Sequence, residues 1–210
     1  MTVDIERAEI AIPSVTWHML PEHPEIGYVK ITGMSATTAQ EVTIGIENLL
    51  QQDAAMFILD LRGNGGGLVE AGVEVVKLFS IKGTEIITLH YPDRPDQVNI
   101  ARTEGPFASF PLFIFIDGST ASSAEMVAGA LQASGRAVVI GAPSYGKDSI
   151  QLVFDLQDGS SIHVSAARWS LPGNPSFGGG AGIQPDIPLP SDQLTDMNFI
   201  DIVLRLVASQ

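Results

Sequence analysis

The sequence predicts an α/β fold in which a mostly parallel sheet is flanked by helices and carries an antiparallel hairpin portion. Segments with strand and helix patterns alternate along the chain, which is typical of right-handed βαβ units. Two apolar runs of strand length, at 55–61 and 110–117, lack polar alternation, as strands buried on both faces do. Two further strand-like segments joined by QDGS predict a hairpin within 151–171.

The elements of the first half follow from periodicity and capping signals. In 36–52, Val42 and Ile46 stand at helical spacing behind Ser and Thr capping candidates. We expect, in order, a strand or arm and a loop at 1–24, a strand at 27–31, a helix at 36–52, a strand at 55–61 and a helix at 68–80.

The second half continues the alternation. The polar, proline-bearing stretch 92–109 indicates an excursion between strands. A helix over 122–134 ends at Gly135, a natural C-cap residue. The remaining expected elements are strands at 84–91, 110–117 and 136–141, the hairpin within 151–171, a glycine-rich loop at 173–182 and an amphipathic helix at 192–208.

Length and composition indicate a single folded unit. A chain of 210 residues suits one domain with its own core. Hydrophobic residues make up 45% and charged residues 17%, a composition that excludes a disordered chain. We expect an N-terminal arm at 1–26, the remnant of a preceding region, and one core domain at 27–210.

Charge and cysteine content exclude several function classes. The formal charge of -13 argues against nucleic acid or an anionic membrane surface as partner. The absence of cysteine excludes disulfides, thiolate zinc sites and a cysteine nucleophile. The opening MTVDIERAEI is too charged for a signal peptide, and no apolar run reaches the roughly 18 residues of a membrane span. An exported parent protein would have lost its targeting segment.

Hydroxyl side chains gather where the strand at 110–117 turns into a helix. We call this segment, DGSTASSAE (117–125), the serine turn. Helix capping alone would account for its Ser and Thr residues. Alternatively, one of them is a nucleophile at the helix N-terminus, where free backbone N–H groups and the helix dipole can stabilise an oxyanion. The segment by itself leaves both interpretations open.

The same ambiguity holds for the glycine loop, RGNGGG (62–67), which follows the strand at 55–61. Consecutive glycines form tight turns, but they also let a backbone N–H approach a substrate without Cβ obstruction. In parallel sheets, sites form where strands end and helices begin. The glycine loop and the serine turn therefore qualify as the two halves of one site.

Lys147 allows three interpretations. From Gly141 to Lys147 the sequence nearly matches a phosphate-binding P-loop, but Asp148 replaces the Ser/Thr metal ligand and a strand follows instead of a helix. Ser144 and Lys147 match S-x-x-K, but Pro143 disfavours the helical turn, and neither S-D-N nor K-T-G occurs. In the third interpretation Lys147 is the general base for a serine, a role that requires burial to lower its pKa.

The four histidines offer no clear alternative base. His18, His23, His90 and His163 all fall in strands or loops, with no evident carboxylate partner and no metal-ligand spacing. We interpret each as structural. A Ser-His-Asp triad is not refuted by the sequence, but no residue pattern supports it.

Several short motifs stand in a fixed order along the chain. They are DLRGNGGGL (60–68), TASSAE (120–125), the run from Ala128 to Gly141, YGKDSIQ (145–151), DGS (158–160), AR (167–168) and GIQPD (182–186). In this order, from about 27 to 190, the chain resembles the C-terminal processing peptidases, also called tail-specific proteases.

This resemblance implies a serine endopeptidase that cleaves protein or peptide substrates near their C-termini by acyl transfer. It implies that Ser122 is the nucleophile, that Lys147 is the general base, and that Gln151 orients the lysine. No metal and no organic cofactor would be needed. It further implies a location outside the cytoplasm, in a periplasm, an extracytoplasmic space or a lumen.

The resemblance also assigns an oxyanion hole and a fold. The hole would be formed by the amide of Ser123 and by a glycine amide, that of Gly66 in the first place and otherwise that of Gly67. The fold would be a crotonase/ClpP-like sheet core. Two local departures stand out: Ser123 and Ala124 reverse the usual Ala-Ser order, and Tyr145 replaces the usual Phe.

One larger departure concerns substrate choice. Relatives carry a PDZ domain before this core, and such domains bind a substrate's C-terminus by strand addition. Because the first core strand begins at 27, no room remains here for a PDZ domain. The sequence leaves the oligomeric state open.

Two other function classes stay open. The same fold family includes acyl-CoA enzymes, which would bind CoA and would give Lys147 no role. Alternatively, the chain is a non-catalytic peptide-binding module or a latent protease core.

Overall fold

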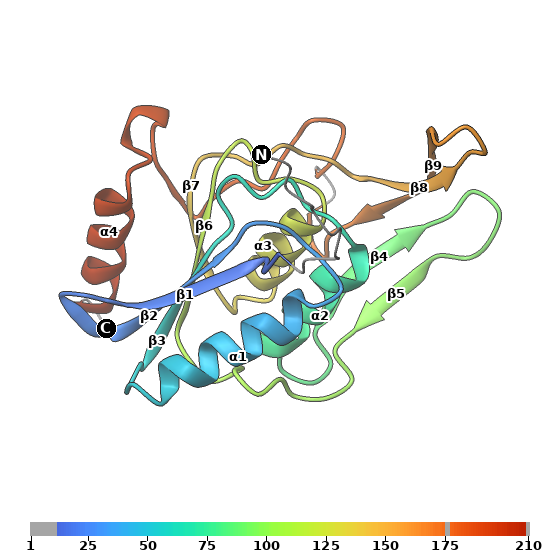
Figure 1. Ribbon diagram of the computed structural model, residues 1–210. Coiled ribbons are helices and arrows are strands. Elements are labelled where there is room, and N and C mark those ends of the chain that lie inside the picture. The colour runs from blue at the N-terminus through green and yellow to red at the C-terminus, as the bar shows by residue number, and fades with distance from the viewer. Residues whose placement is uncertain (1–11, 175–176, 209–210) are drawn as a thin grey trace, which may run out of the picture.

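A computed structural model describes residues 12–174 and 177–208. Within them the chain forms two sheets and four α-helices. Figure 1 shows α4 on one face of the larger sheet and α1, α2 and α3 on its other side, with the smaller sheet projecting beyond them. The helices in these ranges are all too short or too polar to cross a bilayer.

The larger sheet is mostly parallel, as predicted. In this sheet β2, β3, β6, β7 and β10 run parallel to one another, and only β1 pairs antiparallel, with β2. Strand β1 falls inside the segment 1–26 that the sequence set apart as an arm. The strand order is β1 (Val15–Leu20), β2 (His23–Ile31), β3 (Met56–Asp60), β6 (Leu112–Ile116), β7 (Val138–Gly141) and β10 (Ile187–Pro188).

The helices lie inside the segments predicted for them. They are α1 (Thr38–Leu50), α2 (Val69–Phe79), α3 (Ser123–Ala133) and α4 (Asp196–Ala208). Gly135 has φ +66° just after α3, so it ends the helix as expected. The last helix starts later than predicted, because a short 3-10 turn, Ser191–Gln193, comes first.

The smaller sheet is entirely antiparallel and contains the predicted hairpin. Its order is β5 (Gln97–Ile100), β4 (Glu85–His90), β9 (Ser161–Ser170) and β8 (Ser149–Asp155). Strand β5 lies in the stretch 92–109 that was expected to be irregular. It is an edge strand with no buried residue, so it lacks the apolar alternation that marks a half-buried strand. The two-residue strand β10 was also missed.

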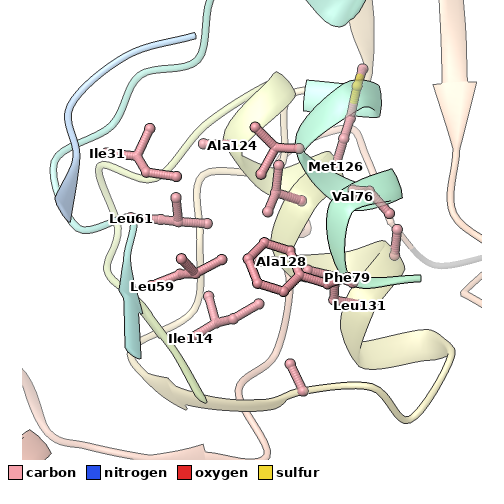
Figure 2. Close-up of a cluster of buried hydrophobic side chains, with 14 of the residues drawn as sticks. Ile31, Leu59, Leu61, Val76, Phe79, Ile114, Ala124, Met126, Ala128 and Leu131 are labelled. Atoms are coloured by element: carbon pink, nitrogen blue, oxygen red, sulfur yellow. The ribbon is translucent and has the colours of Figure 1, made fainter. Parts of the chain in front are cut away.

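The core lies on both faces of the larger sheet. Figure 2 shows Leu59 and Ile114 of the sheet, and Leu61 just after β3, pointing toward Phe79 of α2 and Leu131 of α3. A second cluster on the opposite face packs the sheet against α4, and it includes Ile58, Phe113, Phe115, Phe199 and Val203. Every residue of β3 and β6 is buried, which confirms the prediction made from their continuous apolar runs.

Candidate active site

The glycine loop and the serine turn meet at one edge of the larger sheet. They follow β3 and β6, which are neighbouring parallel strands whose ends therefore lie side by side. Thr120 Oγ1 donates a 2.9 Å hydrogen bond to Leu61 O, and Ala121 N–H donates one of 2.9 Å to Asn64 O. The two segments that the sequence singled out are thus one hydrogen-bonded unit.

Ser122 occupies a strained position at the start of α3. It is the N-cap residue, with φ 57° and ψ -125°, and its exposed fraction is 9%. A positive φ is unfavourable for any residue other than glycine and is concentrated at functional sites. The next residue, Ser123, has an N–H with no acceptor among the described residues. This free amide and the helix dipole can together stabilise a negative charge beside Ser122.

Gly66 lies directly against Ser122. A Cβ atom on Gly66, which has φ +94°, would lie 2.8 Å from Ser122 Cβ and 3.1 Å from Ser123 N. Only glycine permits this approach. The Gly66 amide, however, donates a 2.9 Å hydrogen bond to Asn64 Oδ1.

The adjacent Gly67 keeps its amide without an acceptor in the described ranges. Its φ is +150°, and a Cβ atom there would lie 2.1 Å from Met34 O. Asn64 holds the loop in this shape: it is fully buried, and its Nδ2 donates a 3.0 Å bond to Ile31 O. Of the two predicted glycine amides, that of Gly67 is therefore the freer one.

Lys147 lies in the lysine loop, residues 142–148, between β7 and β8. Its N–H donates a 2.9 Å bond to Glu125 Oε2, and the same oxygen accepts the Ser122 N–H at 2.8 Å. One carboxylate thus joins the backbones of both predicted catalytic residues. Their side chains are not hydrogen-bonded to each other: in the described part of the chain Lys147 Nζ makes no hydrogen bond or ion pair.

Gln151 makes no hydrogen bond to the lysine. It lies on β8 opposite Ser165, just after an irregularity in the pairing, and it is exposed. Its side chain makes no hydrogen bond to any residue that the structure describes. Tyr145, which replaces the usual Phe, is 61% exposed, so solvent can satisfy its hydroxyl.

Asp60 and Arg62, the charged residues at the start of the DLRGNGGGL motif, form an ion-pair cluster, which we call the brace. It lies on the face of the larger sheet that packs against α4. Asp60 is 1% exposed and pairs with Arg62 at 2.7 Å and with Lys30 at 3.0 Å. Tyr28 donates a hydrogen bond to the same carboxylate. The Arg62 guanidinium lies over the Phe199 ring, 4.5 Å from its centroid. The motif therefore links β2 and β3 to α4 through Arg62, the first residue of the glycine loop.

This brace has strong electrostatic consequences. Burial alone would raise the pKa of Asp60, but hydrogen bonds from Arg62 and Tyr28 and the charges of Arg62 and Lys30 outweigh it and lower that pKa. For Tyr28, burial and the charge of Asp60 raise the pKa. For Arg62, burial opposes the charged form, but bonding to Asp60 prevails and raises the pKa.

The expectation that the histidines lack a carboxylate partner is wrong for His23, whose Nδ1 lies 3.4 Å from Glu25 Oε1, and for His90. His90 does have a carboxylate partner, because its Nδ1 lies 2.8 Å from Asp96 Oδ2, and its Nε2 lies 2.8 Å from Ser170 Oγ. The pairing was hidden in the sequence because Asp96 comes back to His90 only through the turn between β4 and β5. This Ser-His-Asp chain lies on the smaller sheet, with the His90 and Asp96 side chains 40% and 56% exposed. Ser170 ends a strand and is not at a helix N-terminus.

Glu125, Ser144 and Asn64 also belong to the site, although no sequence pattern assigned them the contacts that they make there. All three are buried polar residues: the Asn64 and Glu125 side chains accept backbone N–H groups of the site, and the Ser144 hydroxyl donates to the Glu125 carboxylate and accepts the Ile183 N–H. The only signal in the sequence was position: Glu125 is the third residue of α3, where a capping-box carboxylate is expected. Ser144 was weighed only as a nucleophile.

Comparison with known proteins gives consistent matches. The model of "Peptidase family S41" matches residues 25–189. "Carboxyl-terminal-processing peptidase 1, chloroplastic" of Arabidopsis thaliana is 36% identical over 161 residues, which are 77% of this chain and 33% of that protein. "Carboxy-terminal processing protease CtpA" of Bacillus subtilis is 31% identical over 199 residues, 95% of this chain and 42% of that protein.

A solved structure agrees with these matches. "Photosystem II D1 C-terminal processing protease" superposes with a TM-score of 0.72 at 29% identity, covering 89% of this chain and 51% of that one. The crotonase/ClpP-like α/β fold that the resemblance implied is thereby confirmed. The chain spans less than half the length of the two curated relatives named above.

Proposed function

The chain belongs to peptidase family S41, and from this premise we propose that it is a serine endopeptidase in which Ser122 and Lys147 form the catalytic pair. The names of these relatives describe processing of carboxyl termini. We extend this to the present chain and propose protein or peptide substrates cleaved near their C-termini. Following the relative named as chloroplastic, we place the activity outside the cytoplasm.

The proposed reaction is acyl transfer in two steps. Neutral Lys147 takes the proton of the Ser122 hydroxyl as Oγ attacks the scissile carbonyl, and the oxyanion is stabilised by the amides of Ser123 and Gly67. Lys147 then gives this proton to the leaving amine, which departs as the acyl-enzyme forms. In the second step Lys147 takes a proton from water, and the hydroxide attacks the ester. The bond to Oγ breaks and Ser122 regains its proton.

The observation that carries this proposal is the environment of Ser122. It combines positive φ, a helix N-terminus and a free neighbouring amide, and it shares a carboxylate with the backbone of Lys147. Helix capping alone would not require the strained backbone, because capping residues ordinarily have φ/ψ in the β region. The departure at Ser123 is harmless in this scheme, since only its backbone takes part.

The surface beside the lysine loop suits extended, apolar substrates. Strand β8 begins directly after the loop and is an edge strand, so its outer backbone groups are open to pairing. It exposes Leu152, Val153 and Phe154, whose exposed fractions are 50%, 55% and 52%. Open edges of this kind bind extended peptides by strand addition. This supports a substrate preference for non-polar chain ends.

Labelling with a fluorophosphonate probe, followed by mapping of the modified residue, tests the proposal. We expect modification at Ser122, abolished in Ser122→Ala and strongly slowed in Lys147→Ala. Ser170→Ala serves as the matched control, because Ser170 is the serine of the other hydrogen-bonded chain. Modification at Ser170 would refute the Ser-Lys pair, and so would a rate of Ser122 labelling that stays the same in Lys147→Ala.

One observation favours a second candidate, a latent core. Lys147 Nζ and the Ser122 hydroxyl are not hydrogen-bonded in this conformation, and no hydrogen bond joins the Gln151 side chain to the lysine. A latent core would label slowly, and an added protein segment that positions the loops would accelerate its labelling. An acyl-CoA enzyme, the remaining alternative, would instead turn over CoA thioesters without help from Lys147.

A further inference from the structure

We propose that Glu125 is a positioning residue, whose buried carboxylate sets the place of Lys147 relative to Ser122. The inference rests on the proposed function of those two residues as a catalytic pair. It assigns Glu125 no contact with substrate and no part in proton transfer. Its action is to lock two separate backbone segments into one geometry.

The carboxylate accepts four hydrogen bonds, two on each oxygen. Oε2 accepts the N–H groups of Ser122 at 2.8 Å and of Lys147 at 2.9 Å. Oε1 accepts the Gly146 N–H at 2.6 Å and the Ser144 hydroxyl at 2.5 Å. One donor thus belongs to the serine turn and three to the lysine loop.

A capping role explains only the first of these bonds. In a capping box the third helical residue accepts the N–H of the N-cap residue, here Ser122. The three bonds from the lysine loop are additional and come from residues 19 to 22 positions further along the chain. These bonds restrict which residues can stand at Ser144 and Gly146, and a helix cap alone would not impose that restriction. Coupling of the two segments accounts for all four bonds.

Burial makes the coupling strong. Glu125 is 0% exposed, and no Lys, Arg or His in the described ranges forms an ion pair with it. A buried carboxylate is tolerated only when its oxygens are fully hydrogen-bonded, and such charge-assisted bonds are stronger than neutral ones. The helix N-terminus adds a favourable dipole. Movement of the lysine loop away from α3 would leave this carboxylate short of donors.

The lysine loop also contacts residues 180–183, on the side away from Glu125. Ser144 accepts the Ile183 N–H on its hydroxyl at 2.7 Å and donates its own N–H to Ile183 O at 3.1 Å. A Cβ atom on Gly146 would lie 2.6 Å from Gly180 C and 2.7 Å from Ala181 C. The loop therefore fits between Glu125 and residues 180–183. Its glycine is required because φ is +85° and the space behind it is filled.

Substituting Glu125 with Gln removes the acceptor for two of the four donors, while the side-chain volume stays nearly the same. An amide has only one acceptor oxygen, so its NH₂ group must face two of the four donors. A displacement of the base by about 1 Å costs on the order of 100-fold in rate. We expect Glu125→Gln to slow labelling of Ser122 by about that factor. Glu47→Gln, at an exposed position of α1, is the charge-matched control and should label at the normal rate.

A double-mutant cycle tests whether Glu125 acts through Lys147. If it does, Glu125→Gln added to Lys147→Ala slows labelling no further, because the base that it positions is gone. A merely structural role would slow both backgrounds by the same factor, and this result would overturn the proposal. If Glu125→Gln does not fold, Ser144→Ala, which removes one donor, replaces it with an expected loss of about tenfold.

Amide hydrogen exchange distinguishes failure of this proposal from failure of the catalytic pair. In Glu125→Gln, we expect exchange at Gly146 and Lys147 to accelerate about tenfold or more, while strand β6 stays protected. Unchanged exchange in the loop would overturn the positioning role whatever the labelling shows. Labelling that does not depend on Lys147 would instead overturn the catalytic pair, even with accelerated exchange.

Discussion

Gly66 and Ser122 are packed so closely that the addition of one methyl group to Gly66 would place it 2.8 Å from Ser122 Cβ. Real Cβ atoms do not tolerate such a distance, so either the glycine loop or the serine turn would have to move. The neighbouring glycines differ. Gly63 has a positive φ but open space around its Cβ position, and Gly65 has open space with no positive φ. Alanine at these three positions therefore allows the effect of steric overlap to be measured apart from that of backbone strain.

Gly66→Ala is expected to lose both stability and labelling of Ser122. Strain and overlap together should cost about 2–5 kcal/mol. Gly63→Ala should lose about 1–3 kcal/mol from strain alone and keep labelling, and Gly65→Ala should change neither. Urea unfolding and probe labelling of the three variants check this. Normal labelling in folded Gly66→Ala would show that the close approach has no functional role.

Asp60 should make the fold sensitive to acid. Its pKa is lower in the folded chain than in the unfolded one, so its stabilisation is present above the unfolded pKa of about 3.9 and is lost as pH falls through the folded value. Asp60→Asn breaks a buried ion pair and should cost about 3–5 kcal/mol near neutral pH. Unfolding midpoints measured from roughly pH 7 down to pH 2 should begin to approach each other below about pH 4 and should coincide once the pH lies below the folded pKa of Asp60.

The exposed Asp93 provides the control for that experiment. Asp93→Asn should follow the native curve at every pH, because its carboxylate has no partner to lose among the described residues. A constant gap between the native protein and Asp60→Asn down to the lowest pH would contradict the lowered pKa.

Ser123→Ala should be neutral or stabilising. The Ser123 hydroxyl is buried and has no hydrogen-bond partner within the described residues. An unsatisfied buried hydroxyl costs about 1–3 kcal/mol, so its removal should raise the free energy of unfolding by roughly 1 kcal/mol. Labelling of Ser122 should persist, since the proposed oxyanion donor is the backbone amide. A clear loss of stability would indicate that the hydroxyl has a partner after all.

Arg136→Lys should destabilise the fold without altering Ser122 labelling per folded molecule. Arg136 donates 2.9 Å hydrogen bonds to the carbonyls of Phe79 and Phe107, and a further bond to that of Phe110. A lysine ammonium cannot reproduce the planar fork, so at least one carbonyl loses its donor. We expect a loss of about 1–3 kcal/mol in urea unfolding. An unchanged midpoint would show that the fork geometry is dispensable.

The parts of the structure that the sequence revealed are those in which local pattern and burial coincide. The strands 55–61 and 110–117 were predictable because both faces of β3 and β6 are covered, which leaves a continuous apolar signal. The junctions after them followed from the general geometry of parallel sheets.

What the sequence did not reveal depends on tertiary contacts between distant residues. The partnership of His90 with Asp96 requires a hairpin through β5, whose exposed residues carry no periodic signal. The four bonds to Glu125 require the lysine loop to return to α3. Capping explains a glutamate at this position in sequence, so nothing local marked it as exceptional.

The open edge of β8 also affects how the isolated chain will behave in solution. Leu152 and Phe154 face Val164 and Ile162 across the hairpin, which makes one contiguous apolar surface beside unpaired backbone groups. Edges of this kind template strand-to-strand association. The net charge of -13 opposes this association by repulsion between molecules. Salt screens that repulsion, so concentrated, salt-rich preparations should aggregate first through this hairpin.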